Sequence, residues 1–475
     1  MPLQNLRLSR LLTALLGSQL LLFGAPVTAA QPTPAVALAA AVSAQPDFAP
    51  PSANHCRRPM RTHEVPGRPD VAEPAVSIGK ALPRSRAPSV SRDAAAKAAS
   101  PAVALSMERP PEALAVAPAP APTIGGNREA RPVVTAGMVD DNADFAEYLA
   151  FRARTNVPHQ ARDISERHLL TVRDRTGRGV PDAQVQVRSP EGALLRARTD
   201  SAGRVWLHPR SFDTGQSTLY EVTASHGGQT AQGLLRRGQK DALELQLDGA
   251  VAPQRARLDL VFLIDATGSM ADEIQKLKSS LRSIADDSAR LPSRPDLCFG
   301  LVAYRDTTDP FVLRSHDFTN DLGAFQKVLN QLQADGGGDY PEAMGEALHE
   351  TVHRLSWRGE GATRMVVLLA DAPPQLGPDR PTYDAAMQVA LGKGIKVFSV
   401  GASGLDPQGE FIQRQIAQYT GGRFVFLTYD RAEDPASGPG RETVHDVKNY
   451  SVATLDRLIG RLIREELAPL SRKGA

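Results

Sequence analysis

The pattern of hydrophobic and polar positions in residues 256–470 alternates between two periods. A continuous apolar run over residues 258–264 predicts a strand that is covered on both faces. Residues 271–291 then repeat their apolar positions at helical spacing. The alternation continues, with strands expected at 297–304, 364–370, 395–400 and 424–427, and helices at 321–332, 341–355, 383–391, 410–419 and about 455–463. Repeated strand–helix units predict an α/β fold with a doubly wound, mostly parallel sheet.

A different pattern occupies residues 167–249. Short runs such as 183–188 alternate apolar and polar positions, and turns rich in glycine, proline and aspartate separate them. Short strands spaced about 10–15 residues apart predict a small antiparallel β-sandwich. Before it, Phe145, Tyr148 and Leu149 recur at helical spacing, which predicts a short helix within a lead-in at 140–166.

The first 30 residues have the pattern of an export signal. Arg7 and Arg10 precede an apolar run at 11–23, and small residues follow at 25–30. A membrane span takes about 20 apolar residues, so the run favours a cleaved signal peptide at 1–30 over an uncleaved anchor or a soluble helix. We therefore expect an exported protein, located in the periplasm, outside the cell or at the cell surface.

Alanine and proline dominate the segment that follows. Residues 31–125 contain 17 prolines, 24 alanines and a single aromatic residue, Phe48. Such a stretch cannot bury enough apolar surface to offset its chain entropy, so we expect a disordered tether at 31–139. Cys56 lies in this tract and Cys298 in a predicted buried strand, and we expect no disulfide between them.

The charge balance excludes some classes of partner. The 55 basic and 53 acidic residues give a net charge of +2, which argues against a chain devoted to polyanions. No run rich in Lys and Arg has interleaved aromatic residues, so we expect no nucleic-acid binding. No later segment has 18 consecutive apolar residues, so the mature protein is expected to be peripheral to a membrane at most.

Oxygen-bearing side chains gather at the predicted strand ends, where ligands bind on parallel sheets. They are Asp265, Thr267 and Ser269 after the first strand, Asp339 and Glu342 in a glycine-rich loop, and Asp371 after the third strand. Carboxylates and hydroxyls without thiol or imidazole suit a hard divalent cation, Mg²⁺ or alternatively Mn²⁺ or Ca²⁺.

These motifs resemble the von Willebrand factor type A (VWA) domain and its metal-ion-dependent adhesion site. The family's Asp-x-Ser/Thr-x-Ser motif matches Asp265, Thr267 and Ser269, and its third-loop aspartate matches Asp371. The resemblance covers 256–470. It implies a non-enzymatic domain whose metal is completed by an Asp or Glu carboxylate of a protein partner, in adhesion or envelope complex assembly.

Two further resemblances are narrower. The second loop departs from the common threonine form and is similar to the integrin β version, which implies Glu342 as a ligand and Asp339 as a neighbouring carboxylate. Asp272 and Glu273 match an adjacent regulatory metal site of that version. The β-rich segment, with Asp-x-x-Gly-x-x-Val-Pro from Asp174, resembles carboxypeptidase-regulatory-like and Ig-like modules.

Two other functions compete with this interpretation. The sequence His349-Glu350-Thr351-Val352-His353 matches the H-E-x-x-H motif of zinc proteases, which would make the protein a metalloenzyme. The apolar pattern of that helix turns both histidines outward, and no metzincin extension follows. The other alternative is a VWA scaffold with no functional metal site.

Overall fold

The computed structural model describes residues 56, 61–68, 133–215, 217–249, 255–291, 294–338 and 340–471. All of them belong to one compact unit, Gln45–Ala475. The expected signal peptide at 1–30 and the candidate ligand Asp339 fall outside the described residues. Within the described part, no helix is both long and apolar enough to cross a bilayer.

Five parallel strands form the centre of a ten-stranded sheet. In spatial order they are β11 (Asp296–Tyr304), β10 (Arg257–Asp265), β13 (Ala362–Ala370), β14 (Ile395–Gly401) and β15 (Phe424–Arg431). Each of these five strands includes one of the strand segments that the sequence pattern predicts. The α/β class is therefore confirmed, with a parallel core in the order expected for crossover connections.

Antiparallel strands extend the sheet at both edges, which the sequence did not predict. On one side β12 (Phe311–Thr319) pairs with β11, and β1 (Thr62–Pro66) pairs with β12. On the other side β2 (Thr135–Val139) pairs with β15 and with β17 (Ala453–Thr454). A further strand, β16 (Asp434–Pro439), pairs with β15. The sheet is thus mixed rather than mostly parallel at its margins.

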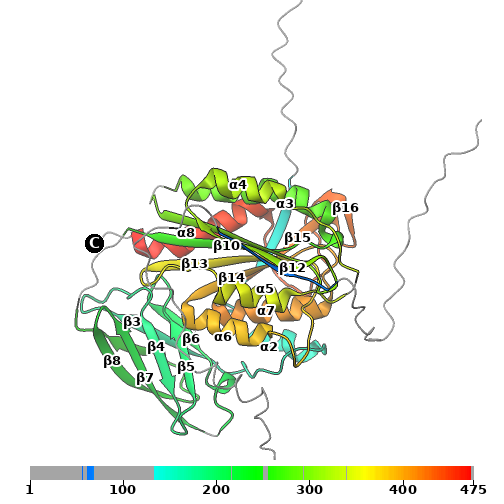
Figure 1. The fold of residues 1–475 in the computed structure, drawn as a ribbon. Helices are drawn as coiled ribbons and strands as arrows, with labels where there is room; N and C mark the ends of the chain where they lie inside the picture. Colours follow the sequence, from blue (N-terminus) through cyan, green and yellow to red (C-terminus); the bar gives the residue numbers. More distant parts are fainter. Residues whose placement is uncertain are drawn as a thin grey trace, which may run out of the picture. The chain divides into compact units, whose positions relative to one another are not determined.

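Helices cover both faces of this sheet (Figure 1). One layer contains α3 (Ala271–Ala289), α4 (Leu322–Gln331) and α8 (Leu455–Ser471), and the other contains α5 (Met344–His353), α6 (Tyr383–Lys393) and α7 (Pro407–Thr420). Successive side chains of β10 point to opposite faces of the sheet and pack against the two helix layers in turn. Phe262 packs in the core with α3, α4 and α8, whereas Val261 and Leu263 pack in the core with α5, α6 and α7. This double burial explains why the strand is continuously apolar.

Local signals determine where the helices begin and end, and α7 is a clear example. The side chain of Asp406 accepts a hydrogen bond from the Gly409 N–H at 2.7 Å, and Pro407 occupies the first turn. The helix ends at Gly421, whose φ of 78° lies in the left-handed region that glycine adopts without strain.

Two predictions about the N-terminal region were wrong. The tether at 31–139 is interrupted, because β1 and β2 are both strands of the large sheet. Cys56 and Cys298 form a disulfide, with Cα atoms 5.9 Å apart. Each outcome depends on strand pairing between remote segments. β1 pairs with β12 at one edge of the sheet, and β12 in turn pairs with β11, the strand that contains Cys298. β2 pairs with β15 and β17 at the other edge.

Between β2 and β10, the described residues form the α-helix α2 (Phe145–Arg154), the short 3-10 helix η1 (Pro209–Ser211) and two small sheets. The helix α2 lies inside the predicted lead-in. One sheet contains β6 (Arg204–Leu207), β3 (His168–Arg173) and β9 (Leu243–Gln246), and the other β5 (Leu194–Arg198), β4 (Gln184–Arg188), β7 (Leu219–His226) and β8 (Gln229–Arg236). We call residues 167–249 the β module.

The pairing inside the β module differs from the prediction at one point. β3 and β9 run parallel, so an antiparallel arrangement throughout was wrong. The chain passes through the other sheet between these two strands, and such a crossover allows parallel pairing. The likeness of the β module to carboxypeptidase-regulatory-like and Ig-like modules stays a prediction.

Candidate metal centre

The candidate ligands come from three loops at the carboxyl ends of the central strands. Asp265 is the last residue of β10, and Asp371 directly follows the neighbouring parallel strand β13. Glu342 precedes α5, and its backbone N–H donates to the Pro373 carbonyl at 3.0 Å while its carbonyl accepts from the Gln375 N–H at 2.9 Å. The backbone therefore ties the glutamate loop to the Asp371 loop.

The Asp-x-Thr-x-Ser segment forms a compact set of oxygens. The N–H and the hydroxyl of Thr267 donate to Asp265 Oδ1 at 3.0 and 2.7 Å. The hydroxyl oxygens of Thr267 and Ser269 lie 3.1 Å apart. Thr267 is buried, whereas Ser269 is exposed, so this set opens to solvent on the serine side.

A close-packed glycine loop, residues 336–338, lies against this set. The Gly268 N–H donates to the Gly336 carbonyl at 3.0 Å. A Cβ at Gly337, whose φ is +72°, would lie 2.7 Å from Thr267 Cβ and 3.2 Å from Glu342 Oε1. The lack of a side chain at Gly337 therefore lets the loop approach the threonine and the glutamate together. Asp339, the next candidate, lies outside the described residues.

The carboxylates of this site are buried beside one another. Asp265 is 0% exposed and Glu342 is 3% exposed. Burial, followed by the charge of Asp371, raises the pKa of Asp265 to about 7. Burial, followed by the charge of Asp265, raises the pKa of Glu342 to about 9. The buried phenol of Tyr304 also has a raised pKa, from burial and from the same three carboxylates.

Two of these carboxylate oxygens have no hydrogen-bond partner among the described residues. They are Asp265 Oδ2 and Glu342 Oε2, both inaccessible to solvent. An unpaired buried polar oxygen is costly, and two such carboxyl oxygens from separate loops are more so. A divalent cation bound by carboxylate and hydroxyl oxygens would satisfy both, so the residues present fit Mg²⁺ or Mn²⁺.

The side-chain types that most often surround a metal ion do not cluster by themselves in the described part of this chain. Within the described part of the chain, no three His, Cys, Asp or Glu side chains meet as a metal-binding group. That result covers Asp265, Glu342 and Asp371, so these three carboxylates do not form such a group by themselves, and the candidate set depends on the hydroxyls of Thr267 and Ser269 as well. Asp265, Thr267, Ser269, Glu342 and Asp371 lie at the same edge of the sheet, and their role as metal ligands stays a prediction.

Sequence reasoning missed the supporting function of the loop between β11 and β12, residues 305–310, which we call the acidic loop. The side chain of Asp309 accepts hydrogen bonds through Oδ2 from the Gly337 N–H at 2.9 Å and the Asp306 N–H at 3.1 Å. Asp306 in turn accepts from the side chain of Gln375. The signal was a pair of aspartates, Asp306 and Asp309, in the loop that follows a buried strand, two residues or more beyond Tyr304, which is the register partner of Asp265.

In the structure, Asp272 and Glu273, the residues expected to form a neighbouring metal site, have different surroundings from each other. Glu273 is buried, and its Oε1 accepts from the Ser403 N–H at 3.0 Å and the Tyr429 hydroxyl at 2.8 Å. Asp272 is exposed. Through Oε1, Glu273 thus joins α3 to the loop after β14 and to β15, while its Oε2 is buried without a hydrogen-bond partner among the described residues, and a metal site there stays a prediction.

The H-E-x-x-H segment of α5 does not have the geometry of a protease. His349 is exposed and its ring stacks on that of His353, with centroids 4.1 Å apart. Glu350 is buried on another side of the helix, where Oε1 accepts from the Ser315 hydroxyl at 2.8 Å and lies 2.9 Å from His63 Nδ1. A glutamate held in this way does not face a metal between the histidines.

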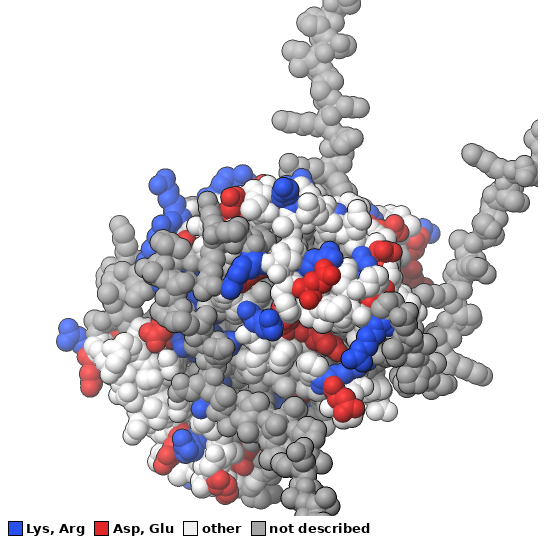
Figure 2. All heavy atoms as spheres, in the orientation of Figure 1, with Lys and Arg blue, Asp and Glu red and all other residues white. Residues whose placement is uncertain are grey.

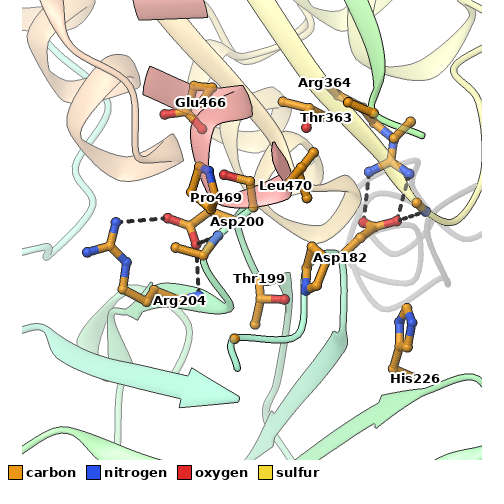
Figure 3. Close-up of a pocket in the computed structure, with 18 of the residues that line it drawn as sticks. Asp182, Thr199, Asp200, Arg204, His226, Thr363, Arg364, Glu466, Pro469 and Leu470 are labelled. Carbon is orange, nitrogen blue, oxygen red and sulfur yellow. Dashed lines mark hydrogen bonds and ion pairs between the residues drawn. The ribbon is translucent and has the colours of Figure 1, made fainter. Parts of the chain in front are cut away.

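A cavity of about 550 Å³ lies at the opposite ends of the strands, between the β module and the sheet. Figure 3 shows Asp182 and Arg364 pointing toward one another across it, with Arg364 Nη1 and Nη2 donating to the carboxylate at 2.9 and 3.1 Å. Lys396, also in its wall, donates to Glu466 at 2.8 Å. These opposite charges satisfy one another, so the cavity is a weaker candidate for chemistry than the strand-end site.

The charges on the drawn face of the molecule are mixed in sign. On the face drawn in Figure 2, Lys and Arg side chains are interspersed with Asp and Glu side chains. That mixture agrees with the net charge of +2. A focused charge at the strand ends is therefore a better basis for recognition than the overall field.

Comparison with known proteins identifies the domain. Residues 259–429 match the family model of the von Willebrand factor A domain. The alpha-protein kinase vwkA of Dictyostelium discoideum is 30% identical over 121 residues, which are 24% of this chain and 18% of that protein. Hemicentin-1 of Homo sapiens is 35% identical over 83 residues, 18% of this chain and 1% of its own length. The chain contains a von Willebrand factor A domain.

The similarity is limited to this domain. The chain spans less than a fifth of the length of these relatives, so their whole-protein activities do not transfer to it. Among solved structures, the PilB minor pilin from Streptococcus sanguinis covers 70% of this chain and 99% of the pilin, with 12% identity and a TM-score of 0.32. A TM-score at that level supports no inference about function.

Proposed function

We propose that the VWA domain binds a divalent cation, Mg²⁺ or Mn²⁺, through Asp265, Thr267, Ser269, Glu342 and Asp371, and captures a protein partner there. The observation that carries the proposal is the pair of buried, unpaired oxygens, Asp265 Oδ2 and Glu342 Oε2. When bound, the cation supplies a Lewis-acidic position that accepts a carboxylate of the partner. Asp339, which lies outside the described residues, stays a further candidate from its place in the sequence.

The protein's own residues prepare this binding. The hydroxyls of Thr267 and Ser269 are neutral donors, so they leave more of the cation's charge for an incoming Asp or Glu than carboxylates would. The hydrogen bonds from Thr267 hold one oxygen of Asp265 in place and leave the other for the cation. The activity we propose for this arrangement is binding of a partner's carboxylate.

The disulfide supports the proposed location. Disulfides persist in oxidising compartments such as the periplasm and the cell exterior. The Cys56–Cys298 bond therefore favours export, as does the N-terminal pattern of the sequence. We propose that the protein acts in adhesion or complex assembly at the cell envelope.

Titration of the full-length chain with MgCl₂ in a calorimeter tests the metal site directly. The expected result is binding by the native protein and loss of the heat signal in Asp265→Asn. Asp287→Asn, which changes an exposed carboxylate on α3, is the matched control and should bind as the native chain does. Equal Mg²⁺ affinity in all three proteins would refute the site.

The metalloenzyme alternative has its own test. A zinc protease would require His349, so its activity on a denatured protein substrate would need Zn²⁺ and disappear in His349→Ala. We expect no proteolysis by either protein. Capture of peptides that contain aspartate, dependent on Mg²⁺ and abolished by EDTA, is the activity expected instead.

A further inference from the structure

The short edge strand β1 is connected to the candidate metal centre by a continuous set of contacts. It runs antiparallel to β12, with His63 opposite Ser315 and Glu64 opposite Arg314. In Figure 1 it is the blue strand beside β12. Without β1, β12 would be the free edge of the large sheet.

Side chains of β1 and of the preceding Arg61 contact β12 and α5. Arg61 pairs with Asp317 at 2.9 Å, and Glu64 pairs with Arg314 at 2.6 Å. The Glu64–Arg314 pair is open to solvent and contributes little to stability. Asp317 is largely buried, and so is Glu350, which lies 2.9 Å from His63 Nδ1. β1 nevertheless has only five residues and, within the described part of the chain, pairs along one side alone. The strong attachment is covalent, through the Cys56–Cys298 bond to β11.

The end of β1 rests on the acidic loop. The Gly67 N–H donates to the Pro310 carbonyl at 3.2 Å, and the Arg68 N–H donates to the Thr307 carbonyl at 2.8 Å. The contact is tight, because a Cβ at Gly67 would lie 1.8 Å from the Asp309 carbonyl oxygen. β1 therefore fixes the backbone of the acidic loop on its outer side.

The acidic loop then positions the glycine loop. Asp309, in direct contact with Gly67, accepts from the Gly337 N–H at 2.9 Å. Gly337 lies against Thr267 and Glu342, two of the candidate ligands. Asp309 is thus a positioning residue, since it acts on the site through the glycine loop.

We propose that the Cys56–Cys298 disulfide is a redox-sensitive clamp that holds β1 against the acidic loop and so maintains cation affinity at the strand-end site. This regulation rests on the proposed metal-binding function. A dithiol reductant would break the S–S bond and convert both cysteines to thiols, while the dithiol gives up two hydrogens and closes its own disulfide. Release of β1 removes two backbone hydrogen bonds from the acidic loop and loosens the glycine loop.

The clamp predicts a coupling between the disulfide and the metal. The disulfide keeps β1 at a high effective concentration beside β12. When the disulfide is reduced, β1 can dissociate from β12 and bind again. Coupling energies between sites in proteins are usually worth about 5–150-fold in affinity, and we expect about tenfold here. Reduction should also expose the β12 edge, so that the amides of residues 313–315 exchange faster with solvent.

The test compares three full-length proteins, the oxidised native chain, Cys56→Ser and Gly67→Ala, by Mg²⁺ calorimetry and amide hydrogen exchange. We expect about tenfold weaker Mg²⁺ binding in Cys56→Ser, with faster exchange in β12. Gly67→Ala should also bind more weakly although its disulfide is intact, because its methyl group displaces the acidic loop. Dithiothreitol should weaken the native chain to the level of Cys56→Ser and leave Cys56→Ser unchanged.

Each outcome decides a different point. Equal Mg²⁺ affinity in the native chain and Cys56→Ser would overturn the clamp while leaving the proposed function intact. Absence of Mg²⁺ binding in the oxidised native chain would instead overturn the proposed function, and the clamp as a control of metal affinity with it. Slow exchange in β12 after reduction would show that β1 stays docked without the disulfide, which contradicts the clamp.

Discussion

Replacing Asp265 by asparagine should stabilise the metal-free protein while abolishing its response to Mg²⁺. The side chain is 0% exposed, one oxygen has no partner, and its pKa is raised from 3.8 to about 7. A raised pKa means that the folded state favours the protonated carboxyl. The contribution of the Asp265 carboxyl to the free energy of unfolding is fully present below pH 4 and is lost as the pH rises through 7.

The size of this loss follows from the shift in pKa. About three pKa units at 1.36 kcal/mol each would give roughly 4 kcal/mol, and because Asp371 shares the charge we take about 2–4 kcal/mol for Asp265 itself. For a domain of this size, that amount corresponds to a change of about 5–15 °C in Tm. Asparagine keeps an acceptor for Thr267 and carries no charge, so it should avoid the loss at pH 8.

Thermal unfolding followed by circular dichroism is a suitable assay, with EDTA or with Mg²⁺, at pH 5 and pH 8. In EDTA at pH 8, Asp265→Asn should unfold at a higher temperature than the native chain, and at pH 5 the difference should shrink. Mg²⁺ should raise the Tm of the native chain and not that of the variant. Asp287→Asn serves as the exposed control. If Asp265→Asn is less stable than the native chain in EDTA at pH 8, the reasoning about the unpaired buried charge is refuted.

Three further predictions concern other parts of the molecule. Asp182→Ala should destabilise the fold by about 3–5 kcal/mol in urea unfolding, because it leaves the buried Arg364 guanidinium without its carboxylate, and unchanged stability would contradict that. Gly337→Ala should weaken Mg²⁺ binding more than tenfold by calorimetry, because its Cβ would lie 2.7 Å from Thr267 at a φ of +72°. Native affinity in this variant would show that the glycine loop does not support the site. His349→Ala should leave Mg²⁺ affinity and Tm unchanged, because the ring is exposed and His349 is not one of the candidate metal ligands. A loss of Mg²⁺ binding in His349→Ala would count against that assignment.

The central strands and their helices could be predicted because their signals are local. The apolar run at 258–264 reports burial on both faces, and the observed strand β10 extends it by one residue at each end. The oxygens of Asp265, Thr267 and Ser269 belong to one short segment, so their spacing alone suggested that they meet. The strand β12 was missed because Arg314 and His316 interrupt its apolar positions. Arg314 is accommodated there by Glu64 on β1, 250 positions away in the chain.

The sequence by itself therefore determined the α/β class and the oxygen-rich strand ends, because periodicity and short-range spacing are properties of consecutive residues. Only the tertiary structure decided which distant segments meet. It brought Glu342 to the Asp371 loop through backbone hydrogen bonds, joined Cys56 to Cys298 across 242 positions, and set Gly67 against the acidic loop. Such pairings depend on strand register and loop closure between remote segments, and a single-chain pattern of hydrophobic and polar residues contains no record of either.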